Sequence, residues 1–263
     1  MPPTSGLTRV ATYRRALPVS EERVWENVRD WEHLPWLHEG SFASIALEDE
    51  GEWGWRARIG PQGGDPFQLE LVIEPDEPRY VSRTLDGNGA GTEIWTRVDA
   101  RDDQHTDVEV EFFVPHVDAG KADALGSVFV DLYTRLWDED ESMMVRRAEE
   151  LAARRAAGAK TAEPVTLGTL ADVKSRLPLV VEYAGARFRI VEHEDGLVAH
   201  SVICPHRLGP LEDAPVEAGR VTCPWHGYTF DVATGRECTG RRMRLAVAPR
   251  VEIDERTSQV RLV

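Results

Sequence analysis

Cys204-Pro205-His206 and Cys223-Pro224-Trp225-His226 are the two stretches of this sequence that decide its fold. Each stretch supplies one thiolate and one imidazole, spaced as C-x-H in the first and as C-x₂-H in the second. Zinc accepts two Cys and two His, but its usual spacing is C-x₂₋₄-C followed by H-x₃₋₅-H. The mixed pairs indicate instead a sulfide-bridged pair of irons, in which two Cys hold one iron and two neutral His hold the other.

The residues around these ligands resemble the Rieske family over about residues 164–263. The first loop reads CPHRLGPL over residues 204–211, and the second reads CPWHGYTFD over residues 223–231. The motif is specific because four ligands recur in paired order beside Pro and Gly. The resemblance implies Cys204 and Cys223 as ligands of the inner iron, and His206 and His226 as ligands of the outer iron.

A disulfide joins the two loops in respiratory-chain Rieske proteins. The corresponding positions in this sequence are Gly209 and Trp225, which cannot form one. Without this disulfide, we expect a 2Fe-2S cluster whose reduction potential lies at the low end of the Rieske range, about −150 mV. Clusters of that type occur in oxygenases and ferredoxins.

The composition is that of a globular chain long enough for two domains, with 263 residues of which 41% are hydrophobic. The cluster uses two of the three Cys and leaves Cys238, so a disulfide framework is excluded and a reducing compartment is expected. Residues 1–6 lack a signal pattern, and no run approaches the ~18 apolar residues of a membrane helix. We therefore expect a cytoplasmic protein with no membrane partner.

The charge is acidic and unevenly distributed. The net charge is −15, while residues 164–263 hold 13 basic and 13 acidic side chains, so the whole excess belongs to the first 163 residues. Such a surface argues against nucleic acid or an anionic membrane as a partner.

The first 163 residues predict strands and two helices. Residues 7–17 alternate as a strand, and a helix starts after Ser20 and ends or kinks at Pro35. A long helix is predicted over residues 122–157, followed by a linker over residues 158–164. Runs rich in β-branched and aromatic residues predict six further strands, at residues 41–48, 52–59, 67–74, 79–85, 92–98 and 106–114.

This order of elements resembles the helix-grip fold of the START/polyketide-cyclase (SRPBCC) superfamily, to which the catalytic domains of Rieske oxygenases belong. The resemblance implies a curved sheet and a long helix that enclose an apolar pocket. We therefore predict an α+β helix-grip domain over residues 1–160 and an all-β Rieske-type domain over residues 164–263. The domain order is the reverse of that in typical Rieske oxygenases.

A second iron site is predicted around Pro35. The pattern Asp30-x₂-His33-x₄-His38 resembles the mononuclear-iron motif of Rieske oxygenases, which implies His33 and His38 as ligands and Asp30 as the bridge for electrons. Residues five apart diverge in a straight helix, so the two imidazoles meet only if the helix breaks between them. His116 is the substitute ligand if His38 is not one.

The third ligand of such a site is a carboxylate, which in the family comes from the long helix. Asp140 lies four residues after Leu136 and three before Met143, on the apolar stripe, whereas Asp138 falls on the polar face. A carboxylate on a buried stripe needs a partner. We predict Asp140 as the ligand, with Asp138 as the alternative.

Together, these resemblances imply a Rieske non-haem iron oxygenase. An external reductase or ferredoxin would reduce the cluster, and the mononuclear iron(II) would use O₂ to oxidise a small apolar substrate. In the family, neighbouring subunits of a ring bring the two metal centres together, which suggests a homotrimer. The alternative is a non-catalytic Rieske electron-transfer or redox-sensing protein whose metal-free helix-grip domain binds a hydrophobic ligand.

Overall fold

The structure is a computed structural model that describes residues 4–156, 158, 161–194 and 196–263. The chain divides into two compact units, Met1–Ala148 and Glu149–Val263. Part of the predicted linker, residues 159–160, and the predicted last residue of the long helix, residue 157, lie outside the described residues. Among the helices in the described part of the chain, none combines the length and apolar character that a bilayer crossing requires.

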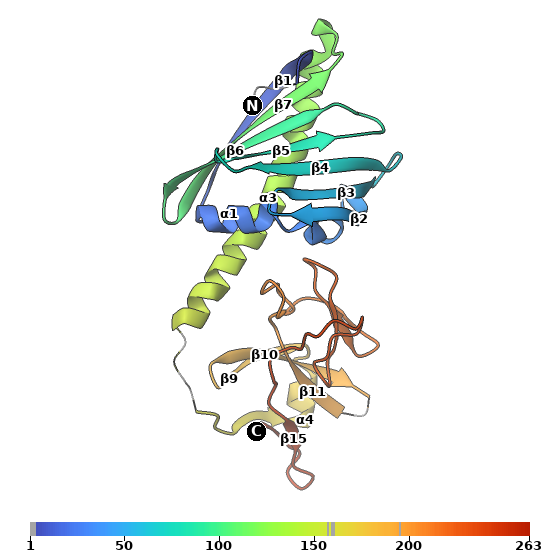
Figure 1. Ribbon diagram of the computed structural model, residues 1–263. Coiled ribbons are helices and arrows are strands. Elements are labelled where there is room, and N and C mark those ends of the chain that lie inside the picture. The colour runs from blue at the N-terminus through green and yellow to red at the C-terminus, as the bar shows by residue number, and fades with distance from the viewer. Residues whose placement is uncertain (1–3, 157, 159–160, 195) are drawn as a thin grey trace. The chain divides into compact units, whose positions relative to one another are not determined.

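The first unit is built on a seven-stranded antiparallel sheet in the order β1-β7-β6-β5-β4-β3-β2 (Figure 1). Neighbours in sequence pair through short turns, and β1 closes the order by pairing with β7. The sequence predicted all seven strands. Their bounds are Leu7–Leu17 (β1), Phe42–Gly51 (β2), Gly54–Pro61 (β3), Phe67–Glu74 (β4), Arg79–Thr84 (β5), Glu93–Asp102 (β6) and His105–Pro115 (β7).

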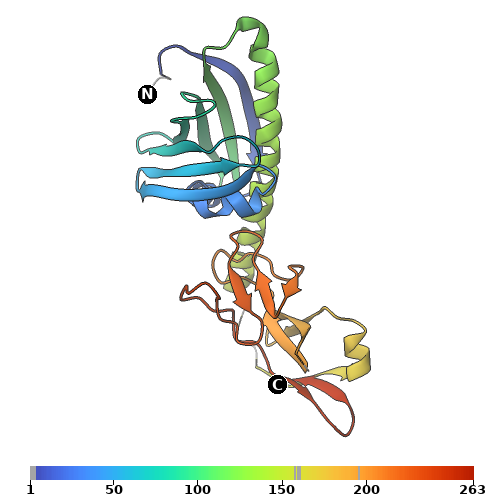
Figure 2. The same ribbon diagram turned by 90° about the vertical axis from the view of Figure 1, so that its right-hand side faces the viewer.

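The long helix α3 spans Ala122–Ala156, after a short 3₁₀ turn at Ala119–Lys121 (η2), and lies along the curved sheet (Figure 2). Its Trp137 and Met144 are buried in one core with residues of the sheet such as Trp55. Gly126 allows α3 to approach β1 closely, because a Cβ at this position would lie 2.3 Å from the carbonyl oxygen of Val10 on β1. The α+β helix-grip arrangement predicted from the sequence is confirmed.

The segment between β1 and β2 breaks earlier than predicted. Helix α1 covers Glu21–Val28 and ends there, a 3₁₀ turn covers Trp31–His33 (η1), and a short helix α2 covers Leu34–Leu37. The prediction that Pro35 ends or kinks the first helix is therefore wrong. Pro35 lies in the first turn of α2, where proline is tolerated because its missing N–H would have no partner in the helix.

After the end of α3, the second unit is all-β apart from one helical turn, as predicted. Its three small sheets have the orders β11-β10-β9, β12-β13-β14 and β15-β16-β8. Strands β8, β10, β11 and β16 form a core with residues such as Phe188, Ile190 and Leu262. The bounds are Val165–Thr169 (β8), Leu170–Lys174 (α4), Leu179–Tyr183 (β9), Ala186–His193 (β10), Gly196–Ser201 (β11), Val216–Glu217 (β12), Arg220–Thr222 (β13), Thr229–Asp231 (β14), Val251–Ile253 (β15) and Gln259–Leu262 (β16).

Candidate metal centres

The two cluster loops of the second unit close in the same way. The N–H of Cys204 donates to the carbonyl oxygen of Gly209, and the N–H of Cys223 donates to that of Tyr228, both at 2.8 Å. In each loop the acceptor lies five residues after the cysteine. The loop after β11 and the loop between β13 and β14 therefore each present a cysteine at a fixed backbone turn.

The four predicted cluster ligands come together between these loops. Cys204, Cys223 and His226 are buried, and the rings of His206 and His226 have centroids 4.5 Å apart. The two thiols contact each other, which raises the pKa of Cys204 and lowers that of Cys223 to about 5, helped by His226. Two thiols on one side and two imidazoles on the other fit a Rieske-type 2Fe-2S cluster.

Gly209 and Trp225 occupy the positions of the disulfide that the sequence lacks. A Cβ on Gly209 would lie 2.7 Å from Sγ of Cys223 and 3.1 Å from the ring of Trp225. The two positions therefore face each other, and the buried indole of Trp225 packs where the disulfide would be. Only glycine fits between the sulfur and this ring.

Two arginines support the cluster loops, and neither role was evident in the sequence. The Nη1 of Arg241 donates to the hydroxyl of Tyr228 at 2.5 Å, and the ring of Tyr228 lies 4.5 Å from that of His206. Arg189 is buried, and its Nη1 donates to the carbonyl oxygens of Leu211 and Ala214 after the first loop. Both contacts restrain backbone or rings next to the ligands.

In the first unit, His33, His38 and Asp140 converge. Their ligand atoms all lie within 4.8 Å of one another, with Oδ1 of Asp140 3.4 Å from Nε2 of His33 and 3.2 Å from Nε2 of His38. His33 ends the 3₁₀ turn and His38 follows α2, so the two ligands lie at opposite ends of a four-residue helix. Two imidazole nitrogens and one carboxylate oxygen form the donor set of non-haem iron(II) sites.

Glu139, which precedes Asp140 on α3, is a residue that sequence reasoning missed. Its carboxylate accepts a hydrogen bond from Nδ1 of His38 at 2.6 Å, which leaves Nε2 of the ring directed at Asp140, 3.2 Å away. Burial lowers the pKa of His38, but Asp140 and Glu139 outweigh this effect and raise it above its ordinary value. Burial likewise opposes ionisation of Asp140, yet His33 and His38 hold the pKa of its carboxyl well below the usual range.

His33, His38 and Asp140 line a pocket of about 130 Å³ between the sheet and α3. Most of the wall is apolar, and burial raises the pKa of the phenols of Tyr80 and Tyr133, which therefore stay neutral. The other lining side chains include Phe42, Trp55, Leu69, Leu71, Leu136 and Trp137.

The remaining predicted residues have the following positions. Asp30 is buried at the N-cap of the 3₁₀ turn and also lines the pocket. Asp138 is exposed and pairs with Arg15 at 2.6 Å, so the alternative ligand lies away from the cluster of His33, His38 and Asp140. His116 follows β7 and takes a positive φ of 54°.

One comparison identifies a known domain in the second unit. Residues 163–248 match the family described as the Rieske 2Fe-2S domain. A segment of 66 residues, 25% of this chain and 20% of the relative, is 35% identical to the oxygenase component of dicamba O-demethylase from Stenotrophomonas maltophilia. The chain therefore spans about a fifth of the length of that relative.

Two solved structures are similar at low scores. A START superfamily protein from Mycobacterium smegmatis has a TM-score of 0.42 at 14% identity, covering 52% of this chain and 97% of that one. The ferredoxin of carbazole 1,9a-dioxygenase from Nocardioides aromaticivorans has a TM-score of 0.33 at 26% identity, covering 38% of this chain and 95% of that one.

Proposed function

Since this chain carries a Rieske 2Fe-2S domain over residues 163–248, we propose that it is a Rieske-type oxygenase component with a second, mononuclear iron in its helix-grip domain. His33, His38 and Asp140 would hold that iron, and Cys204, Cys223, His206 and His226 would hold the cluster. When bound, the cluster supplies single electrons and the iron supplies O₂ activation.

The observation that carries the proposal is the convergence of His33, His38 and Asp140 at the edge of an apolar pocket. A buried carboxylate is costly without a partner, and here two imidazoles with buried rings are aimed at it. One carboxylate and two imidazoles leave coordination positions for O₂ at a bound iron(II). Asp30 would connect this site to the electron donor.

The size of the pocket limits the substrate. A volume of about 130 Å³ is close to that of an apolar cavity that binds benzene, about 150 Å³. Apolar side chains would orient the substrate and exclude water, while the neutral hydroxyls of Tyr80 and Tyr133 would donate hydrogen bonds. We propose a small apolar substrate, about the size of one ring, that carries at most a few polar atoms.

The electrons would come from an external reductase or ferredoxin, since the sequence offers no flavin or nicotinamide motif. In a homotrimer, Asp30 of one subunit would meet the cluster of a neighbour.

Metal analysis of protein purified without oxygen tests the proposal. We expect about three irons and two acid-labile sulfides per chain, and His33→Ala should lower the iron to about two while the cluster absorbance stays unchanged. The matched control is His105→Ala, whose imidazole is exposed at the start of β7 and pairs with the exposed carboxylate of Asp102. It should keep about three irons.

The same metal analysis distinguishes the proposed oxygenase from the alternative function. Two irons per chain in the unsubstituted protein, unchanged by His33→Ala, would indicate an electron carrier or redox sensor whose helix-grip domain holds no metal.

A further inference from the structure

Tyr228 contacts both histidines of the cluster site and a positive charge at the same time. The centroid of its ring lies 4.5 Å from that of His206, edge to face, and 6.0 Å from that of His226, in a stacked arrangement. The Cζ atom of Arg241 lies 4.4 Å from the centroid of the same phenol ring, and Nη1 of Arg241 donates to the hydroxyl at 2.5 Å. Tyr228 is only 5% exposed, so a buried ring connects the guanidinium with both imidazoles.

The backbone that carries Arg241 is fixed by a buried carboxylate. Glu237 accepts hydrogen bonds from the N–H groups of Thr239 and Arg241, each at 2.9 Å, and from the hydroxyl of Thr239 at 2.6 Å. Arg241 is therefore held at both ends, by Glu237 at its backbone and by Tyr228 at its guanidinium. A side chain held in this way keeps its charge at one place next to the ring.

A positive charge at this place acts on the redox chemistry of a 2Fe-2S cluster. Reduction adds one electron, and a nearby cation stabilises the added negative charge by direct electrostatic attraction. Net charge, hydrogen bonds and solvent exposure set the reduction potentials of iron–sulfur clusters. The attraction is stronger across a buried ring than across water, because the local dielectric constant is lower.

We infer that Arg241 is a positioning residue that raises the reduction potential of the 2Fe-2S cluster through Tyr228. Its guanidinium orients the phenol against His206 and His226 and places a positive charge on the ring that contacts these two ligands. This effect opposes the low potential expected from the missing disulfide. The inference rests on the cluster of the Rieske domain and is independent of the proposed mononuclear iron.

Redox titration of the cluster-loaded protein, followed by its visible absorbance, tests this inference. Arg241→Gln removes the charge and should lower the reduction potential. We expect the one-electron equilibrium to shift about tenfold, which corresponds to about 59 mV. Arg241→Lys keeps the charge and should lose less than half as much. An unchanged potential in Arg241→Gln would overturn the inference.

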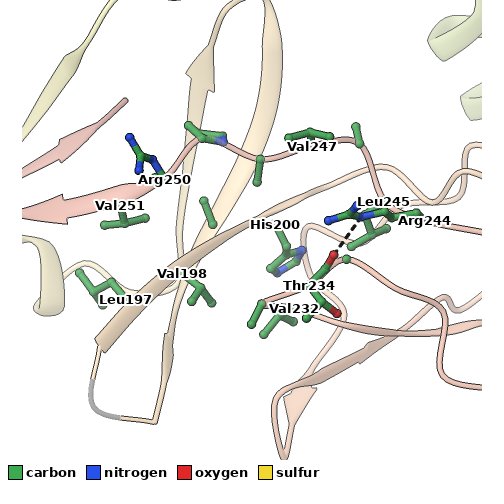
Figure 3. A pocket seen from close by; sticks show the side chains of 16 residues that line it. Leu197, Val198, His200, Val232, Thr234, Arg244, Leu245, Val247, Arg250 and Val251 are labelled. Carbon is green, nitrogen blue, oxygen red and sulfur yellow. Dashed lines mark hydrogen bonds between the residues drawn. The ribbon is translucent and has the colours of Figure 1, made fainter.

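Arg244→Gln is the matched control. Arg244 is an exposed arginine of the same segment, but its Nε donates to the carbonyl oxygen of Thr234 at 3.0 Å (Figure 3). Its charge is screened by solvent, so the substitution should change the one-electron equilibrium by less than about twofold. Equal shifts in Arg241→Gln and Arg244→Gln would mean that only the overall charge of the segment matters, and the role of the contact with Tyr228 would be wrong.

Tyr228→Phe tests whether the charge acts through the phenol. This variant removes the hydroxyl that holds the guanidinium and keeps a ring beside His206. It should lower the potential, and the double variant with Arg241→Gln should lower it no further than Arg241→Gln alone. Additive shifts would show that Arg241 acts without Tyr228. If Arg241→Gln does not retain its cluster, an unchanged potential in Tyr228→Phe still contradicts the inference.

Discussion

His38 is held at both ring nitrogens by consecutive residues of one helix, Glu139 at Nδ1 and Asp140 near Nε2. The stripe of α3 predicted Asp140 because Leu136 and Met143 share its face. Glu139 escaped prediction because its position on the helix points off that stripe, and only the length of its side chain lets it reach His38. Its carboxylate is 42% exposed, so burial gave no signal either.

We predict that Glu139→Ala weakens iron(II) binding in the helix-grip domain about ten- to hundredfold, since it removes the group that orients a ligand imidazole. Chelator competition on the purified protein measures this affinity. Asp138→Ala is the matched control, because Asp138 is exposed and pairs with Arg15. An equal loss in both variants would mean that the acidic turn acts only through its overall charge.

Gly209→Ala should destabilise the cluster loops. The new Cβ would lie 2.7 Å from Sγ of Cys223, so the sulfur or the ring of Trp225 must move, at a cost of about 1–3 kcal/mol. The expected result is a lower melting temperature and less visible absorbance per chain. Gly196→Ala in the same unit is the control, because a Cβ there meets nothing within 4 Å. Full cluster content in Gly209→Ala would show that the loops adjust freely.

At the scale of the elements, helix α1 is tied to helix α3 by an ionic cluster. Glu26 accepts hydrogen bonds from Arg147 on α3 and from the buried Arg23 on its own helix. Burial tends to raise the pKa of Glu26, but the two guanidinium groups outweigh it and lower this pKa below 4.5. The cluster holds α1 in place, just before the turn that carries His33.

Because the folded pKa of Glu26 is lowered, its stabilisation is fully present above the unfolded pKa and is lost as the pH falls through the folded pKa. Glu26→Gln should therefore cost about 1–3 kcal/mol of unfolding free energy near neutral pH. This difference from the unsubstituted protein should shrink at acidic pH. Urea denaturation at several pH values measures both effects.

Glu22→Gln is the control for this experiment. Glu22 also pairs with Arg23, but its side chain is 72% exposed, so its loss should cost less than about 0.5 kcal/mol. A Glu26→Gln effect that is the same at all pH values would rule out the ionic explanation.

Comparison of the predicted and observed elements shows which of them could be predicted from the sequence. The seven strands of the first unit and α3 follow from periodic patterns long enough to fix their type, and the sequence predicted them. The end of α1 at Val28 did not follow, because no proline or glycine marks it and the spacing of Val24, Val28 and Trp31 suggests a longer helix. The segment that follows packs against the core of the sheet through Trp31 and Leu34.

At the scale of the whole molecule, the acidic excess belongs to the first 163 residues, whereas residues 164–263 are neutral overall. The proposed oxygenase needs the Asp30 site to meet a cluster, and we expect neighbouring chains to provide it. Light scattering of the metal-loaded protein should therefore give the mass of three chains of 29.5 kDa. A monomer at all concentrations would contradict the proposed ring and leave both metal sites to be tested separately.

The two carboxylate contacts of His38 affect how an iron ion would bind. Because Glu139 and Asp140 contact the two ring nitrogens, rotation of the imidazole about χ2 is restricted. The ring is therefore already oriented in the folded protein before an ion binds. Iron at Nε2 must displace any proton there, and the raised pKa of His38 favours that proton more as the pH falls. Iron uptake should therefore need no slow conformational rearrangement and should become weaker at lower pH.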